Sequence, residues 1–223
     1  MLFVVTKEGT EELVALRAHV VERHRTTGAH RTVELADPPR PWRDAPDYRA
    51  AVARWRAQRV QRWGDAIHAE LGEGETGAFL VWGDPSLYES TLAVVQQIAA
   101  RPASSLDYEV IPGVSAVHAL TARHRIPLNR VGGAVQITPA RLIADGMPNG
   151  VDDVVVMLDA HATFATIPAD GIDIYWGAYL GTEDELLISG RLSEVSDEIV
   201  RARVDAKARK GWMFDTYLLR RTG

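Results

Sequence analysis

The sequence predicts an α/β protein of two domains, with a mostly parallel sheet in the first domain and a mixed sheet in the second. Two observations lead to this fold class. Strand-like apolar runs alternate with helical stretches through the first half, which is typical of parallel sheets covered by helices. Beyond residue 128 the texture changes to paired glycines and short strand-like runs, which indicates antiparallel or mixed strands. We therefore expect domains at residues 1–127 and 128–223.

The expected elements of the first half follow in regular order. Short runs of β-favouring residues predict strands at residues 2–5, 31–35, 77–82 and 108–111. Apolar residues at helical spacing predict helices ending near residue 24 and spanning 48–71, 87–100 and 117–122. The segment 36–48 is rich in proline and charge and is expected to be an exposed loop. Five arginines of the long second helix are interpreted as its solvated face rather than an anion site: Arg49, Arg54, Arg56, Arg59 and Arg62.

The second half is expected to contain more strands than helices. Strand-like runs occur at residues 134–138, 154–158, 172–176 and 213–219. Two helices are expected among them, at residues 182–188 and 193–210.

Composition and charge exclude several classes of function. The 223 residues include 25 basic and 30 acidic side chains, so a net charge of −5 offers no general field for nucleic acid. Without any cysteine, the chain can form neither disulfides nor cysteine-based metal sites, and it has no thiol nucleophile. No apolar run approaches the ~20 residues of a membrane helix, and the start is charged too early for a secretory signal. We expect a cytoplasmic protein with neither nucleic acid nor membrane as partner.

Two strand-to-helix loops could together form a binding site. Gly83 and Asp84 follow one expected strand, and Ser115 and Ala116 follow the next. Glycine lets a ligand approach the backbone, a carboxylate accepts hydrogen bonds, and amides at a helix start favour an electron-rich group. Each loop alone could equally be an ordinary turn, with Asp84 capping a helix. Two loops at the ends of neighbouring strands make a shared ligand site more plausible.

Other motifs argue against common chemistries. The spacing of His118, His124 and His161 does not suit metal ligands, so we expect no metal site. Ser115 lacks the following glycine of a hydrolase nucleophile elbow. Neither the dinucleotide fingerprint nor the phosphate-binding P-loop occurs.

Four motifs, in this order and spacing, resemble those of the tetrapyrrole (corrin/porphyrin) methyltransferase family. They are Gly-Asp-Pro-Ser-Leu-Tyr at 83–88, Ile-Pro-Gly-Val-Ser-Ala at 111–116, Ile-Pro-Leu at 126–128 and Leu-Gly-Thr-Glu-Asp-Glu at 180–185. Longer stretches, including 78–88 and 173–182, are similar to one branch of the family in particular. The resemblance implies two α/β domains around a trough, a bound S-adenosyl-L-methionine and a homodimer. It further implies methylation of the tetrapyrrole precorrin-5 at C-1 with loss of acetate, in aerobic cobalamin biosynthesis.

The resemblance also implies site residues. Carried over by position, the cofactor site would be lined by Gly83, Asp84, Leu87, Ser115, Ala116, Met157 and Gly181. Because the substrate carries many carboxylates, the candidate substrate-binding residues are Arg123, Arg125 and Arg130. Methyl transfer from a sulfonium requires positioning more than a protein nucleophile or a metal. No catalytic residue is identified, and Asp84 and Glu89 are only guesses for an acid/base group in acetate release.

In one respect the sequence departs from the family. The family's first strand and its glycine-rich loop precede the residues that match Met1, so we expect an incomplete cofactor and substrate site. A misassigned start codon or a truncated chain is the hypothesis, and coding DNA upstream of Met1 would test it. Two alternatives stay open: a methyltransferase of the same fold with another corrinoid, protein or ribosomal RNA substrate, and a non-catalytic S-adenosylmethionine-binding protein.

Overall fold

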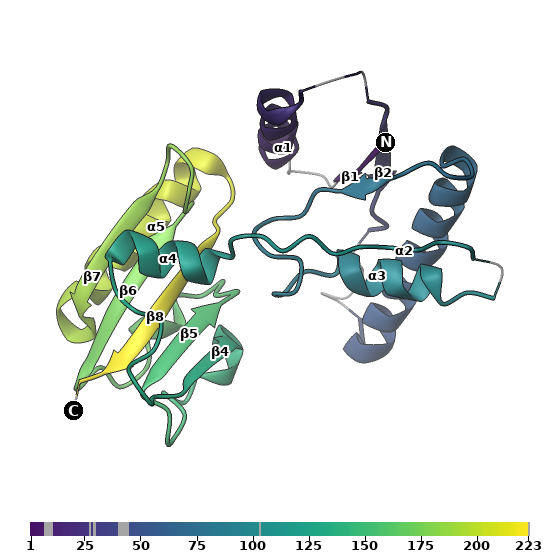
Figure 1. Ribbon diagram of the computed structural model, residues 1–223. Coiled ribbons are helices and arrows are strands. Elements are labelled where there is room, and N and C mark those ends of the chain that lie inside the picture. Colours follow the sequence, from purple (N-terminus) through teal and green to yellow (C-terminus); the bar gives the residue numbers. More distant parts are fainter. Residues whose placement is uncertain (7–10, 27, 29, 40–44, 103, 223) are drawn as a thin grey trace. The chain divides into compact units, whose positions relative to one another are not determined.

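The computed structural model describes residues 1–6, 11–26, 28, 30–39, 45–102 and 104–222. The chain forms two compact units, Met1–Gly113 and Val114–Gly223. Each unit is built around its own sheet, drawn in purple to blue for the first and in green to yellow for the second (Figure 1). Within the described ranges, no helix is both long and apolar enough to cross a membrane.

Three parallel strands form the sheet of the first unit, in the order β2-β1-β3. They are β1 (Leu2–Thr6), β2 (Thr32–Ala36) and β3 (Ala78–Phe79). The helices of this unit are α1 (Glu11–His24), α2 (Tyr48–Glu70) and α3 (Thr91–Ala99). Since helices separate the parallel strands along the chain, the fold class expected for the first half is confirmed.

Aromatic rings pack α2 onto this sheet. Trp63 of α2 and Phe3 of β1 are buried, and the ring of Phe79 stacks on both, at centroid distances of 5.3 and 5.2 Å. Helix α2 begins after Asp47, whose carboxylate accepts a hydrogen bond from the amide of Ala50. Removing these large apolar surfaces from water holds the helix on the sheet.

One arginine of α2 does not belong to a solvated face, so that interpretation was wrong for Arg59. Its side chain is buried, with the guanidinium 4.6 Å from the ring centre of Trp55 and 4.3 Å from that of Trp63. It donates hydrogen bonds to Asp37 at 2.8 Å and to the Ser90 hydroxyl at 2.7 Å. A buried charge is tolerated here because a carboxylate and two aromatic faces surround it. The other four arginines are exposed.

Two strand predictions in the first unit were wrong in extent or in kind. Strand β3 covers only residues 78–79 of the expected 77–82, and residues 108–111 form no strand. Ile111 is 76% exposed. The propensity of a sequence for strands describes how well it fits a pleated, half-buried surface, and a strand forms only where a neighbour pairs with it. Among the described residues, no strand pairs with residues 108–111.

Five strands form the mixed sheet of the second unit, in the order β4-β5-β8-β6-β7. They are β4 (Val135–Pro139), β5 (Asp153–Met157), β6 (Ile172–Ala178), β7 (Leu186–Arg191) and β8 (Asp215–Arg221). Strands β4 and β5 are parallel, whereas the other pairs are antiparallel. The helices are α4 (Ala116–His124) and α5 (Leu192–Lys210), with short 3-10 turns η2 (Ala140–Leu142) and η3 (Thr163–Ala165). This sheet confirms the mixed architecture expected for the second half.

The helix expected at residues 182–188 was wrong. Residues 186–191 instead form β7, which pairs antiparallel with β6 from Ala178↔Leu186 to Asp173↔Arg191. The acidic residues before Leu186 favour a helix start locally, but pairing with a neighbouring strand outweighs such local preferences.

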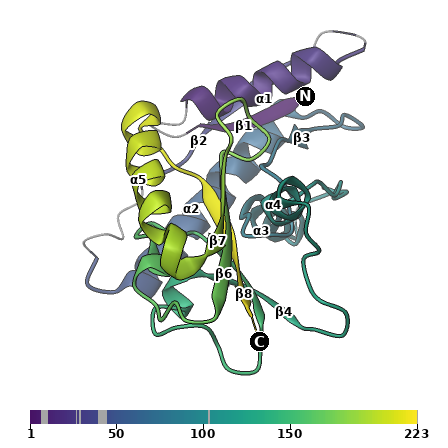
Figure 2. The same ribbon diagram turned by 90° about the vertical axis from the view of Figure 1, so that its left-hand side faces the viewer.

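The two helices of the second unit cover opposite faces of its sheet, as Figure 2 shows nearly edge-on. Trp176 and its neighbours on one face pack into the core with α5. On the other face, a side chain on Gly177 would meet Leu120 of α4 at 2.9 Å and Leu180 at 2.8 Å. Glycine at position 177 therefore lets α4 lie close to the strands.

The division between the compact units lies earlier than the expected boundary after residue 127. Helix α4 contacts β6, β7 and β8, so residues from Val114 onward pack with the second sheet. Local sequence patterns do not reveal which sheet a helix covers. A division into domains 1–127 and 128–223 stays a prediction.

Candidate functional site

The loop at Gly83 and Asp84 is joined by a hydrogen bond to Gly113, the last residue of the first unit. The Asp84 carboxylate accepts from the Gly113 amide at 2.9 Å, and its other oxygen accepts from the amide of Ser86 at 2.8 Å and from the Ser86 hydroxyl. Any side chain on Gly113 would meet the Gly83 carbonyl oxygen at 2.2 Å. Residues 83–86 are therefore held against Gly113 within the first unit, and both oxygens of Asp84 are engaged by the protein. Leu87 is half-buried in the turn after Asp84, where its amide donates to the Asp84 carbonyl at 3.2 Å.

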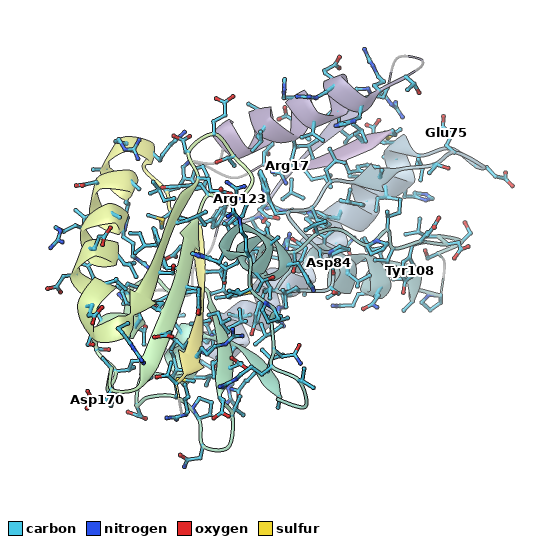
Figure 3. All side chains as sticks on the ribbon, turned by 60° about the vertical axis from the view of Figure 1, so that its left-hand side comes forward. Arg17, Glu75, Asp84, Tyr108, Arg123 and Asp170 are labelled. Carbon is cyan, nitrogen blue, oxygen red and sulfur yellow. The ribbon has the colours of Figure 1, made fainter. Side chains whose placement is uncertain are left out.

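Two further charged side chains lie beside these loops. Glu89 accepts hydrogen bonds from the amides of Ser90 and Thr91 at 2.8 and 2.7 Å, so its contacts are those of a cap of α3. Arg17 of α1 donates to the carbonyl oxygen of Leu80 at 3.3 Å. Burial lowers the pKa of Arg17, and the charge of Glu89 opposes that shift. Figure 3 labels Arg17 and Asp84. Sequence reasoning missed Arg17, since a helical arginine ordinarily faces solvent.

Ser115 and Ala116 lie at the start of α4 in the second unit. Ser115 is 4% exposed, and its hydroxyl lies 2.8 Å from Nδ1 of His118 and accepts from the His118 amide at 3.4 Å. Ala116 is the first residue of the helix. Because the Ser115 side chain is already engaged as a cap, we expect a ligand to meet backbone rather than hydroxyl here.

Met157 and Gly181 lie at the same end of the second sheet. Strands β5 and β6 both run antiparallel to β8, so their last residues meet its first residues, as Met157↔Thr216 and Ala178↔Asp215. We call this the carboxyl end of the sheet. Gly181 has φ +80°, and a side chain there would meet no atom within 4 Å. The position therefore requires glycine for its backbone and leaves open space beside it.

A buried polar cluster lies at this carboxyl end. Its members are Asp159, Trp176, Arg203, Asp215 and Tyr217. The Tyr217 hydroxyl donates to Asp159 at 2.8 Å, and the Trp176 indole donates to Asp215 at 2.8 Å. Arg203 pairs with the Asp215 carboxylate and donates to the carbonyl oxygen of Asp159 at 2.7 Å. Helix α5, strand β8 and the loop after β5 are thereby joined.

Burial raises the pKa of two members of this polar cluster. It raises the pKa of the Asp215 carboxyl to about 6, against the opposing effects of Arg203 and Trp176. Burial and then the charge of Asp159 raise the pKa of Tyr217 above its usual range, so its hydroxyl is a neutral donor. Sequence reasoning missed the cluster. The available signal was an aspartate directly after Met157-Leu158, at a strand end like that of Asp84.

The structure does not gather the three candidate arginines in one place. Arg123 pairs with Glu185, which also accepts from the Gly181 amide at 3.0 Å, so Arg123 lies near the carboxyl end. Arg125 is exposed and ends α4 in a left-handed conformation with φ 58°. Arg130 lies 3.5 Å from the Asp153 carboxylate at the start of β5, which is the amino end of the sheet. Arg123 and Arg130 are thus at opposite ends of the strands.

In the part of the chain that the structure describes, no three histidine or carboxylate side chains are grouped as metal ligands.

The family model described as Tetrapyrrole (Corrin/Porphyrin) Methylases matches residues 6–196 of the chain. A precorrin-6A synthase [deacetylating] from Sinorhizobium sp is 44% identical over 222 residues, covering 99% of this chain and 85% of that protein. A precorrin-4 C(11)-methyltransferase from Rhodococcus erythropolis is 27% identical over 153 residues, or 60% of each chain.

Solved structures agree with the family match. A putative cobalamin synthesis related protein (CobF) from Corynebacterium diphtheriae has a TM-score of 0.84 and 31% identity, covering 100% of this chain and 87% of that one. Uroporphyrin-III C-methyl transferase from Thermus thermophilus, solved with S-adenyl homocysteine, has a TM-score of 0.54 and 16% identity, covering 98% of this chain and 84% of that one. The second likeness supports the fold alone.

Proposed function

The chain belongs to the tetrapyrrole (corrin/porphyrin) methylase family, and from this premise we propose that it has the activity of a precorrin-6A synthase (deacetylating). In this reaction precorrin-5, S-adenosyl-L-methionine and water give precorrin-6A, S-adenosylhomocysteine and acetate. The observation that carries the proposal is 44% identity to a precorrin-6A synthase over nearly the whole chain. The likeness to the Corynebacterium structure supports it over the full length.

The residues at the carboxyl end of the second sheet suit S-adenosyl-L-methionine. Leu158, which directly follows Met157, is 62% exposed. A side chain on Gly181 would meet no atom within 4 Å, so the backbone there is open on that side. An apolar surface beside accessible backbone groups can bind an adenosine ring system and a methionyl chain. When bound, the cofactor supplies an electrophilic methyl group, so positioning matters more than a protein nucleophile.

In the first unit, Gly83 and Gly113 are both exposed, so their backbone groups are open to a ligand. Asp84 holds the two loops together through its contacts with Ser86 and Gly113. We assign Gly83, Asp84 and Leu87 to the cofactor site as part of the proposal, together with Ser115 and Ala116 at the start of α4.

Arg123 is the best placed of the arginines for a substrate carboxylate. Its side chain is 58% exposed, and Glu185 connects it to the amide of Gly181 beside the proposed cofactor position. An exposed guanidinium next to the reacting centre can bind a carboxylate of the macrocycle in bidentate fashion. The same role for Arg125 and Arg130 stays a prediction. We also propose that the protein is cytoplasmic and forms a homodimer.

Turnover of precorrin-5 tests the proposal. The purified protein is incubated with precorrin-5 and S-adenosyl-L-methionine carrying a labelled methyl group, and the corrinoid products and acetate are measured. We expect labelled precorrin-6A with one acetate per methyl group transferred. Methylation without acetate, or only of a different corrinoid, would favour another methyltransferase of this fold. Binding of S-adenosylhomocysteine without any methyl transfer would favour a non-catalytic binding protein.

A further inference from the structure

Both strands that end at the proposed cofactor position are followed by a residue in a strained conformation. Leu158 follows β5 with φ 57°, and Tyr179 follows β6 with φ 50°. Ala162, further along the first loop, has φ 55°. None of these residues is glycine, so each left-handed conformation costs about 1 kcal/mol or more. Such conformations persist only where the surrounding structure holds them, and they are concentrated at functional sites.

The Asp159 carboxylate holds the loop after β5. One oxygen accepts from the His161 amide and the Thr163 hydroxyl, both at 3.0 Å. The other accepts from the Thr163 amide at 2.7 Å and from the Tyr217 hydroxyl at 2.8 Å. Four donors therefore converge on one side chain that is only 6% exposed. Two of them are the amides on either side of Ala162, so Asp159 fixes the part of the loop that contains this strained residue.

Contacts just before β8 hold the loop after β6. The amide of Tyr179 donates to the Phe214 carbonyl oxygen at 3.0 Å, and its hydroxyl donates to the carbonyl oxygen of Trp212 at 2.7 Å. The rings of Tyr179 and Trp212 meet edge to face at 4.9 Å. The backbone at Tyr179 is thus fixed to the segment that ends at Asp215.

Arg203 connects the two loops. Its guanidinium donates to the Asp159 carbonyl oxygen in the first loop and pairs with Asp215 at the end of the segment that holds the second. The Trp176 indole donates to the same Asp215 oxygen. Removing any one of these charged groups would leave a buried partner without its counterpart, so the polar cluster acts as a unit.

We propose that Asp159, together with Arg203, Asp215 and Tyr217, is a positioning device that shapes loops 158–163 and 179–182 to hold S-adenosyl-L-methionine. This inference rests on the proposed function, since it concerns the cofactor site of that reaction. Asp159 acts through the loop and need not touch the ligand. Exposing the apolar Leu158 side chain on a strained backbone contributes nothing to folding. A positioning role for Asp159 gives this arrangement a reason.

A matched pair of variants tests the device. Asp159→Asn places an amide group where the carboxylate now accepts hydrogen bonds, so at least one donor loses its acceptor. Asp153→Asn changes a second buried aspartate, which pairs with Arg220 at the start of β5. The dissociation constant of S-adenosylhomocysteine is measured by calorimetry for both variants, and unfolding by denaturant is measured in parallel.

We expect Asp159→Asn to weaken S-adenosylhomocysteine binding about tenfold, which is the scale of one lost hydrogen bond to a charged group. Asp153→Asn should lose stability but bind as the wild type does. Tyr217→Phe removes a single donor and should weaken binding in the same direction by less. If Asp159→Asn fails to fold, Tyr217→Phe decides the question.

Unchanged affinity in the Asp159→Asn and Tyr217→Phe variants overturns the inference and leaves the proposed function intact. An equal loss of affinity in Asp153→Asn also overturns it, because general destabilisation then explains the effect. A wild-type protein that binds no S-adenosylhomocysteine overturns the proposed function and this inference with it.

Discussion

The carboxyl and amino ends of the five-stranded sheet each contain a half-buried arginine paired with an aspartate whose side chain is buried. At the carboxyl end Arg203 pairs with Asp215, and at the amino end Arg220 pairs with Asp153. The arginine side chains are 11% and 12% exposed, so the two pairs are closely matched in burial. They differ in the backbone they hold. Arg203 binds the carbonyl oxygen of a loop with left-handed residues, whereas Arg220 binds the carbonyl oxygens of Pro127 and Leu128 in the connection after α4.

With the cofactor site at the carboxyl end, as proposed, one ion pair would support stability alone and the other would support stability together with ligand binding. Each pair must offset the loss of water around its charges, so neither is expected to add much net stability over an apolar replacement. What separates the ends is the loops beyond the strands. At the carboxyl end Met157 ends β5 and Gly181 lies in the loop after β6, and the family resemblance assigns both positions to the cofactor.

The largest expected effect comes from removing either arginine. Arg203→Met leaves Asp215 and the Asp159 carbonyl oxygen without a charged partner and should lower the free energy of unfolding by about 3–5 kcal/mol. Arg220→Met, which leaves Asp153 with only its longer contact to Arg130, should also lower it, but by less. Denaturant unfolding measures both changes. Calorimetry with S-adenosylhomocysteine then separates them, because only Arg203→Met should lose affinity. Equal losses of affinity would remove the distinction between the two ends.

The second effect is a pH dependence confined to the carboxyl end. The pKa of Asp215 is raised by burial to about 6 in the folded protein, above the value of ~3.9 expected in the unfolded chain. The folded state therefore binds this proton more tightly. The stability it contributes is present below about pH 4 and is lost as the pH rises through 6, by on the order of 3 kcal/mol.

To check this, the free energy of unfolding is measured between pH 4 and 7 for the wild type and for Asp215→Asn, with tryptophan fluorescence as the readout. The difference between the two proteins should change with pH in that interval. A constant difference would mean that the pKa of Asp215 is the same in the folded and unfolded states, which would contradict the prediction.

The third effect separates the candidate arginines. Arg123→Ala should raise KM for the tetrapyrrole about tenfold through loss of a charge-assisted hydrogen bond, with little change in S-adenosylhomocysteine affinity. Arg130→Ala, at the amino end, should change KM less. Steady-state kinetics with precorrin-5 measures both variants. A larger rise in KM for Arg130→Ala would place the substrate at the amino end of the sheet.

The smallest effect concerns two glycines with similar backbones. Gly181 has φ 80° near the carboxyl end, Gly150 has φ 74° shortly before β5, and a side chain on either would meet no atom within 4 Å. Alanine at each position should therefore cost about 1 kcal/mol of stability through backbone strain alone. Only Gly181→Ala should also weaken S-adenosylhomocysteine binding in calorimetry. Equal affinities in both variants would argue against a ligand beside Gly181.

Local patterns in the sequence were sufficient for much of the fold. Periodicity placed α2 and α5 within a few residues, and the alternation of strands and helices predicted the parallel sheet of the first unit correctly. Patterns failed where partners distant in sequence decide the outcome. Residues 186–191 are a strand because β6 pairs with them, and residues 108–111 are not a strand because no described strand does.

The candidate site shows the same limit. Loop motifs indicated Gly83, Asp84 and Ser115, and the structure brings the loops of Asp84 and Gly113 together. The polar cluster was beyond local analysis, because Asp159 and Arg203 are distant in sequence and meet only when α5 packs on the sheet. For the same reason, the acidic partners of Arg123 and Arg130 could not be foreseen.

Methionine methyl groups can test directly whether the carboxyl end of the second sheet holds the cofactor, as we propose. The chain has four methionines, among them Met157 at the carboxyl end and Met147, whose carbonyl oxygen accepts a hydrogen bond from Arg221 at the amino end. NMR spectra of the protein labelled at methionine methyls are recorded during titration with S-adenosylhomocysteine, with signals assigned by Met→Leu variants. If the cofactor binds at the carboxyl end, the Met157 signal should show a saturating shift and the Met147 signal should not move. An unchanged Met157 signal at saturating ligand would contradict it.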